Sequence, residues 1–422
     1  MIGIVCVLML GIFIYMFCAK KNYFNVVTYI FTGVFFPLAL YLLGWSDYII
    51  KERAIVFDYT FVVLAGITFF YCLATVKIKP REILGNEEVV ITKAGTQFVP
   101  LINIVFILLY LAENYIICGM LMPALNGVDI HIQSVPIISF ITNSQIVVIF
   151  ADYFAWKATK KKSYLLSMII VFSLPLVSRA SRMMIVQNAV CFFSLFLFIE
   201  GAGVKKNIIK YLKFKKLRNR LILIGLIFGM CLMAYTNYRM NHFGVYNLSY
   251  SDEIRYSGPE WLEFLSPYYG YFPLSFNNLN ISMLYSDVEH NYFGLYSFTS
   301  FFFGLLQLDN LMNIDVFRPV HEARYSSLAA SVPTGFWEYY YDFGYLCFIP
   351  IIVALIICGF LLKNAAVEED TLIYRAMYFM YIPLWFLMSF QNVLFMAVYI
   401  YTFIFMYFVI KHSFKIVKKS KD

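Results

Sequence analysis

Charged residues are scarce in this sequence. They make up 14% of its 422 residues, whereas about a quarter of the residues of a soluble domain are charged. Hydrophobic residues make up 61%, and the mean hydropathy is +0.73. This composition excludes an ordinary soluble globular protein. Apolar runs long enough to cross a hydrocarbon core of about 30 Å recur along most of the chain, and in lipid such runs must be helical.

The sequence therefore predicts an all-α polytopic integral membrane protein with about eleven transmembrane helices. The first of these helices has no positive segment before it and no small-residue cleavage site after it, so we expect an uncleaved anchor. The expected spans are residues 2–18, 24–44, 57–76, 98–118, 135–156, 164–180, 183–200, 221–237, 342–362, 375–391 and 393–410.

Cysteine and histidine patterns of a metal site or a disulfide framework are absent. All eight cysteines lie in or beside apolar runs, and no CxxC pair occurs. His131, His242 and His290 are scattered along the chain, without metal-ligand spacing. We therefore expect no disulfide framework, no metal and no cofactor.

Cations are nearly absent from every second segment between the expected helices. The positive-inside rule assigns the basic segments to the cytoplasm, so we expect the N-terminus outside and the C-terminus inside. The net charge of +8 then reflects topology, and we expect no nucleic-acid partner. The stretch 205–220 is expected to lie on anionic membrane lipids. The basic segments are 20–21, 77–93, 157–162, 205–220 and 411–421.

Lysine is missing altogether from the longest polar segment, residues 238–342. Its formal cations are four arginines, set among about a dozen Asp and Glu residues and many tyrosines. We expect a large extracytoplasmic loop here, in which the apolar run 291–308 forms an interfacial or re-entrant helix, because a span there would place the basic tail outside. The expected division is helices one to eight in residues 1–237, the loop in 238–341, and three further helices with the basic tail in 342–422.

Two arginines, Arg179 and Arg182, lie in the turn between the sixth and seventh expected spans. Such a pair can snorkel to lipid headgroups. It can also grip a phosphate, for which the planar guanidinium is well shaped. Gln187 and Asn188 follow about one turn later. We keep both interpretations and treat the two amides as candidates for a polar cavity.

A second candidate site is the segment Arg318-Pro-Val-His321-Glu322-Ala-Arg324. It places two cations, one imidazole and one carboxylate within seven positions. His321 or Glu322 could take a proton from a hydroxyl nucleophile, and the arginines could stabilise a departing phosphate. The alternative is a solvated cluster of salt bridges.

Three further carboxylates are candidates for a polar cavity. Glu113 is expected inside the membrane, where a carboxylate is a functional candidate by default. Glu338 and Asp342 lie where the loop leads into the ninth span, with Thr334 placed to cap a short helix. The Tyr and Trp residues around them suit sugar stacking, and an interfacial aromatic belt explains them equally well.

The turn Ser178-Arg-Ala-Ser-Arg182, the large loop and the segment from Arg318 through Gly344 together resemble the Wzy-type oligosaccharide repeat-unit polymerases. That segment ends in Thr334-Gly-Phe-Trp-Glu-Tyr-Tyr-Tyr-Asp-Phe-Gly344, and Tyr345 follows. The stretch from Thr334 to Tyr345 fits a T-G-F-x-E-x-Y-x-D-F-G-Y pattern. The resemblance covers most of the chain in architecture. It implies a GT-C-like, metal-independent glycosyltransferase in the bacterial cytoplasmic membrane.

The resemblance also implies a reaction and its partners. Undecaprenyl-diphosphate-linked oligosaccharides are joined into O-antigen or capsular polysaccharide, and a flippase and a chain-length regulator act in the same pathway. Arg179, Arg182, Arg318 and Arg324 would bind the diphosphates and would face one cavity, with His321 or Glu322 as the general base. An O-antigen ligase-type enzyme is an alternative of the same class. A lipid-linked oligosaccharide flippase or transporter is another, although internal repeats and midplane charges typical of transporters are not evident.

Overall fold

The computed structural model describes most of the chain. The described residues are 1–19, 25–80, 87–123, 135, 138–179, 182–202, 249–290, 292–298, 318–326, 333–367 and 371–418, with isolated positions between 216 and 234. Most of the expected span 221–237, most of the basic stretch 205–220 and the greater part of the apolar run 291–308 lie outside them, as do His131 and His242. The described chain is mostly helical, and every other expected span coincides with a helical segment.

Four helices are long and apolar enough to cross a membrane, and several shorter apolar helices accompany them. The four are α4 (Ile55–Thr75), α5 (Lys93–Cys118), α8 (Lys162–Arg179) and α17 (Phe348–Ala366). The prediction of a helical membrane protein is confirmed at this level, while the count of eleven spans stays a prediction.

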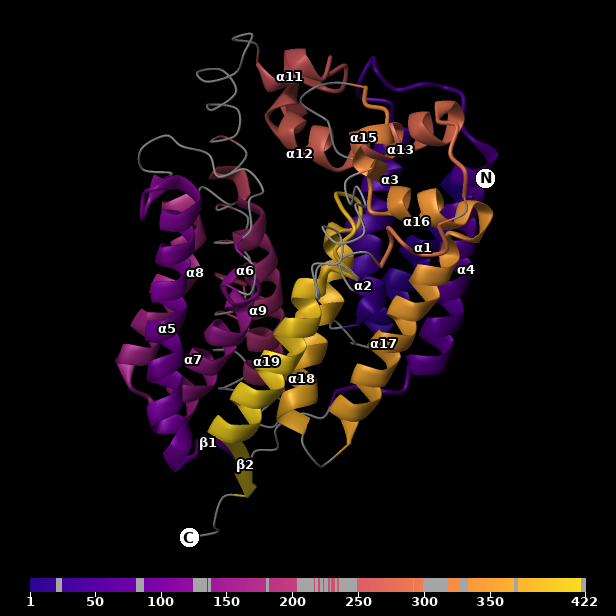
Figure 1. Ribbon diagram of the computed structural model, residues 1–422. Helices are drawn as coiled ribbons and strands as arrows, with labels where there is room; N and C mark the ends of the chain where they lie inside the picture. The colour runs from indigo at the N-terminus through magenta and orange to yellow at the C-terminus, as the bar shows by residue number, and fades with distance from the viewer. Residues whose placement is uncertain are drawn as a thin grey trace. The chain divides into compact units, whose positions relative to one another are not determined.

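The chain divides into two compact units (Figure 1). The first unit comprises residues 1–77, 212–357 and 384–396, and the second comprises 78–211, 358–383 and 397–422. Each unit thus contains segments that are far apart in sequence. The three-part sequential division expected from the sequence stays a prediction, because these units follow contacts within the fold.

The first unit combines long helices with a set of short ones that gather at one end of them (Figure 1). α13 packs against both α3 and α4, so the segment after residue 249 folds back on the N-terminal helices. Besides α4, its elements are α1 (Ile2–Ile14), η1 (Tyr15–Ala19), α2 (Val26–Ile30), η2 (Phe31–Phe35), α3 (Phe36–Leu42), α11 (Tyr250–Glu253), η4 (Glu260–Leu265), α12 (Ser266–Tyr271), α13 (Pro273–Tyr285), α15 (Arg318–Glu322), α16 (Phe336–Phe343) and η6 (Gly344–Leu346).

The second unit is organised around α7 (Gln145–Thr159), whose residues from Gln145 to Ala155 are all buried. α5, α8, α9 and α19 each pack against it. The other elements are α6 (Ile138–Asn143), α9 (Arg182–Ala202), α18 (Thr371–Tyr381), α19 (Ala397–Ser413), β1 (Glu87–Ile91) and β2 (Phe414–Lys418). α17 and η7 (Ile382–Leu387) cross from one unit to the other along the chain.

Local signals in the sequence fix both ends of α5. The Thr92 hydroxyl accepts a hydrogen bond from the Gly95 amide at 2.9 Å, which satisfies one of the free donors of the first turn. Gly119 ends the helix with φ = 68°, a left-handed conformation that glycine adopts without a steric penalty.

A two-stranded sheet was not expected from the sequence. β1 and β2 pair antiparallel, with Val89 opposite Ile416 and Ile91 opposite Phe414. Ile91 and Phe414 are 323 residues apart in the sequence, so no local turn motif predicts the pairing. The basic tail is therefore joined by backbone hydrogen bonds to the polar segment that precedes α5.

Candidate functional site

The first unit carries an open polar pocket at the segment that the sequence singled out. Its volume is about 350 Å³. Arg318, Glu322 and Arg324 line it from α15 and the residues that follow. Ser286, Asp287, Glu289 and Tyr292 line it from the chain after α13. The pocket thus brings three of the four predicted residues of this segment together.

Arg318 and Glu322 form an ion pair one helical turn apart, with Nε 2.7 Å from Oε1. The guanidinium also stacks on the ring of Tyr292, 5.5 Å from its centroid. Tyr341 donates a hydrogen bond from its hydroxyl to the other carboxylate oxygen of Glu322 at 2.7 Å. Its ring lies parallel to that of Tyr292, with centroids 5.2 Å apart. The ion pair is therefore held against two stacked tyrosines, Arg318 by Tyr292 and Glu322 by Tyr341.

The pKa of Glu322 results from opposing causes. Partial burial raises it, but the hydrogen bonds from Arg318 and Tyr341 and the arginine charge outweigh that cause. The net pKa lies below the ordinary glutamate value. Glu322 is therefore an anion at neutral pH, and in the absence of a ligand it is a weaker base than a free carboxylate.

Buried asparagine and serine side chains of α13 hold the pocket wall in place. The Asn278 side-chain oxygen accepts from the Ser326 amide at 2.9 Å, and the Ser282 hydroxyl accepts from the Arg324 amide at 2.8 Å. On the other side, Trp337 of α16 donates to the Pro319 carbonyl at 2.6 Å. Because these bonds satisfy backbone groups of a short segment, they fix Arg318 and Arg324 on the same side of the fold.

Behind Tyr341, α16 carries the two predicted carboxylates one turn apart. Asp342 accepts backbone hydrogen bonds from Tyr296, at 3.1 Å, and from Ser297, and it is buried. Glu338 accepts from the Asn392 side chain at 2.6 Å. Burial raises the pKa of Glu338 to about 8, and the neighbouring Asp342 adds to the rise. Glu338 therefore holds a proton at neutral pH.

Gly335 makes this arrangement possible by letting α16 begin against another stretch of backbone. A Cβ at this position would lie 2.7 Å from the backbone nitrogen of Asn392. The Gly335 amide itself donates to the Met388 carbonyl at 2.9 Å. A glycine is needed here because of the close approach of two backbones.

The second unit holds the other predicted arginine. Arg179, the last residue of α8, forms an ion pair with Glu113 and donates from Nε to the Asn114 side chain at 2.5 Å. Its guanidinium stacks on Tyr110, 4.1 Å from the ring centroid. Glu113 also accepts a hydrogen bond from Thr142 of α6 at 2.6 Å, and one from Ser139. The intramembrane carboxylate predicted from the sequence is thus the partner of the predicted arginine.

The remaining candidates of the second unit lie apart from this pair. Arg182 begins α9, so the two arginines belong to different helices. Gln187 donates to the Tyr399 hydroxyl at 2.8 Å, and Asn188 donates to the Gln145 side chain. These two amides join α9 to α19 and α7, and their recorded bonds do not lead to Glu113. The polar cavity expected from the sequence stays a prediction.

Some expectations about the site stay predictions. His321 is exposed on α15 and is not among the residues that line the pocket. Arg179 and Arg318 belong to different units, so their common cavity is untested. Sequence reasoning missed Asp287, Glu289 and Tyr292, which carry no motif of their own. The sequence feature that could have indicated these three residues was the lysine-free loop in which they lie.

No protein-family model, curated protein or solved structure matches this chain. The site geometry and the family resemblance must therefore carry any statement about function.

Proposed function

We propose that this protein polymerises undecaprenyl-diphosphate-linked oligosaccharide repeat units into a surface polysaccharide, at the outer face of a bacterial cytoplasmic membrane. The observation that carries the proposal is the Arg318–Glu322 ion pair, held against two stacked tyrosines in an open polar pocket. In this proposal the chain has about eleven spans, the N-terminus lies outside and the C-terminus lies inside. A flippase and a chain-length regulator of the same pathway are the expected partners.

The reaction is a glycosyl transfer. A hydroxyl oxygen of the acceptor repeat unit attacks the anomeric carbon of the growing chain, and the bond from that carbon to the diphosphate oxygen breaks. Undecaprenyl diphosphate leaves with the electron pair, and the hydroxyl proton passes to a base. Arg318 and Arg324 stabilise the departing diphosphate, since guanidinium groups suit developing phosphate charge.

Glu322 is suited to be the base because substrate binding changes its surroundings. While Arg318 is paired with Glu322, its hydrogen bond and charge, together with the bond from Tyr341, hold the pKa of Glu322 down. When the guanidinium turns to a diphosphate, the contribution of Arg318 is removed and the effect of burial, which raises the pKa, remains. The carboxylate thus becomes a better proton acceptor when the leaving group is in place. His321 remains the other candidate.

The rest of the pocket suits a sugar. Asp287 and Glu289 present exposed carboxylates, which accept hydrogen bonds from sugar hydroxyls. Tyr292 offers a ring face beside them. Acidic side chains outnumber the two arginines of the lining, so the pocket is better matched to a glycan bearing a phosphate than to a bare polyanion.

The test is the surface glycan of cells that lack the native protein and carry a variant. We expect Arg318→Ala to collapse the polymer ladder to single repeat units, because the leaving group loses its cation. The matched control is Arg255→Ala, which removes an exposed arginine of the same loop that stacks on Tyr48 and not in the pocket. A wild-type ladder in Arg318→Ala combined with Glu322→Ala would overturn the proposal.

The same gel separates the alternatives in cells without the protein. Polymer that is made but not attached to its final acceptor indicates a ligase. Repeat units that never reach the outer leaflet indicate a flippase. Either result replaces the polymerase assignment.

A further inference from the structure

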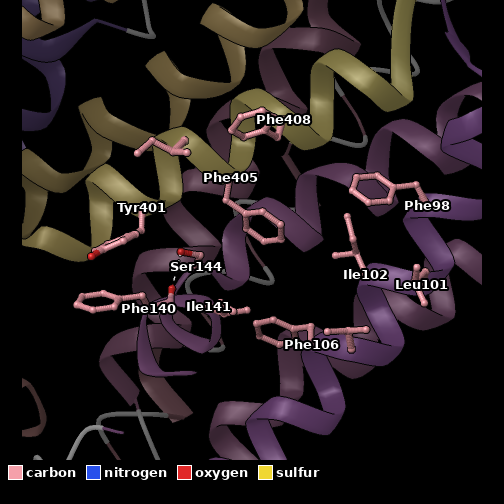
Figure 2. Close-up of a pocket in the computed structure, with 12 residues that line it drawn as sticks. Phe98, Leu101, Ile102, Phe106, Phe140, Ile141, Ser144, Tyr401, Phe405 and Phe408 are labelled. Atoms are coloured by element: carbon pink, nitrogen blue, oxygen red, sulfur yellow. Dashed lines mark hydrogen bonds between the residues drawn. The ribbon is translucent and has the colours of Figure 1, made fainter. Parts of the chain in front are cut away.

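The second unit contains an apolar groove between α5, α6 and α19, with a volume of about 460 Å³ (Figure 2). Phe98 and Phe106 of α5 line one wall, and Phe405 and Phe408 of α19 line the other. The volume lies within the range of roughly 300–1,000 Å³ that is usual for small-molecule sites. Because α5 has the length and composition of a membrane-spanning helix, the groove is expected to open toward hydrocarbon.

Two of the three helices that line the groove, α5 and α6, also contribute to the Arg179 cluster. On α5, Phe106 lines the groove, Tyr110 follows one turn later under the Arg179 guanidinium, and Glu113 pairs with that arginine. On α6, Phe140 and Ile141 line the groove, whereas Ser139 and Thr142 bind Glu113. The apolar groove and the Arg179 cluster therefore follow one another along one face of α5.

We propose that this groove binds the polyprenyl chain of a lipid diphosphate, with the diphosphate at Arg179. The inference rests on the proposed function and deepens it, because an enzyme that joins two lipid-linked glycans needs a binding site for each lipid chain. Guanidinium geometry suits the diphosphate, and Arg179 keeps N–H donors beyond those that bind Glu113 and Asn114. Aromatic and aliphatic side chains suit the chain.

The length of the path favours a polyprenyl chain over the acyl chain of a phospholipid. Glu113 and Phe98 are fifteen residues apart on α5, a rise of about 22 Å at 1.5 Å per residue. A lipid of one leaflet fills about half of a 30 Å hydrocarbon core, which is roughly 15 Å. A chain that starts at Arg179 and reaches Phe98 therefore passes the midplane, which a polyprenyl chain can do.

The test is photolabelling of the full-length protein in lipid nanodiscs, with a polyprenyl diphosphate that carries a photoreactive group at the far end of its chain. We expect the label on residues 98–106 of α5 and 401–408 of α19. Excess unlabelled polyprenyl diphosphate should displace it, and excess phosphatidylglycerol should not. Equal displacement by phosphatidylglycerol would make the groove a site for ordinary membrane lipid and overturn the inference, as would labelling elsewhere.

Groove-filling variants give a second measurement. Leu101 lines the groove and is 55% exposed, so Leu101→Trp should fold while narrowing the channel. We expect labelling to fall about tenfold, the cost of leaving two methylene groups unburied. The control is Ile104→Trp, on the same helix, 58% exposed and outside the lining. Equal labelling of the two variants contradicts the inference.

The two proposals fail separately. If Leu101→Trp labels and polymerises as the native protein does, while Arg318→Ala does not polymerise, the groove assignment is wrong and the polymerase stands. If the groove is labelled as expected but no variant affects a polymer ladder, the polymerase is wrong.

Discussion

The two units each contain one arginine–glutamate pair that the sequence pointed to, and the environments of the pairs differ. In the first unit, the side chains of Arg318 and Glu322 are 47% and 35% exposed. In the second, those of Arg179 and Glu113 are 12% and 2% exposed. The same pairing is therefore screened by water in one place and shielded from it in the other.

This difference assigns different roles to the pairs. An exposed pair contributes about 0–1 kcal/mol to stability, so a ligand can displace one partner at little cost. A buried ion pair stabilises the fold little more than two apolar side chains of the same volume would. Removing one partner, however, leaves a buried charge without its counter-ion. Arg179 thus requires Glu113 as its counter-ion, whereas Arg318 can leave Glu322 for an anionic ligand at little cost.

The largest expected effect is on folding, from Glu113→Ala. Without the carboxylate, the Arg179 guanidinium is a buried charge that lacks its counter-ion. This should lower the free energy of unfolding by about 3–5 kcal/mol. We expect a lower unfolding temperature in detergent and a lower yield of monodisperse protein. The double variant Glu113→Leu with Arg179→Met should recover most of both. Native stability in Glu113→Ala would show that water reaches the pair.

The next largest effect is on catalysis, from Glu322→Gln. It removes the proposed base and should lower the polymerisation rate by about 10²–10⁴, the usual contribution of general base catalysis. Stability should change by no more than about 1 kcal/mol, since the pair is exposed. Rates with purified lipid-linked repeat units and thermal unfolding of the same preparation measure both. If Glu322→Gln lowers the unfolding temperature but not the polymerisation rate, the Arg318–Glu322 pair has a structural role and not a catalytic one.

The two pairs also differ in how much the sequence could reveal. Arg318 and Glu322 are one helical turn apart, so local spacing was enough to predict their contact. Glu113 and Arg179 are 66 residues apart. Glu113 was singled out as a carboxylate expected inside the membrane, and Arg179 as one of two arginines in a turn between two expected spans. Their pairing depends on how α5 packs against α8, which no local pattern specifies.

Hydrophobic length likewise predicted the helices better than their connections. The apolar runs coincide with the long helices, because in lipid the backbone must satisfy its own hydrogen bonds, whereas the short helices from α11 to α15 lie outside those runs. The β1–β2 pairing and the asparagines of α13 escaped prediction, since both depend on contacts between distant segments. Asn278, for example, has no sequence feature that indicates its bond to Ser326.

Tyr341→Phe should have a smaller effect that sharpens the role of Glu322. The hydroxyl lowers the pKa of Glu322 by its hydrogen bond to the carboxylate, so its removal should raise that pKa. The acidic limb of the pH–rate profile should therefore move to higher pH. Tyr325→Phe, which removes another hydroxyl near α15 that bonds a backbone carbonyl, is the control. An unmoved acidic limb would exclude Glu322 as the base.

The last expected effect is on the pH dependence of stability and concerns Glu338, a carboxyl held by an amide from Asn392. Burial raises its pKa from 4.5 to about 8, so the folded protein binds a proton that the unfolded chain releases between these values. The resulting stability is present in full below about pH 4.5 and is lost as pH rises toward 8.

Glu338→Gln should remove this dependence, because the amide stays neutral and can keep the contact with Asn392. The unfolding temperature of the native protein should fall between pH 6 and pH 8.5 by more than that of the variant. Glu260→Gln, which neutralises an exposed glutamate of η4, controls for the loss of a charge. If Glu338→Gln and the native protein lose stability in parallel over this range, the titrating group lies elsewhere.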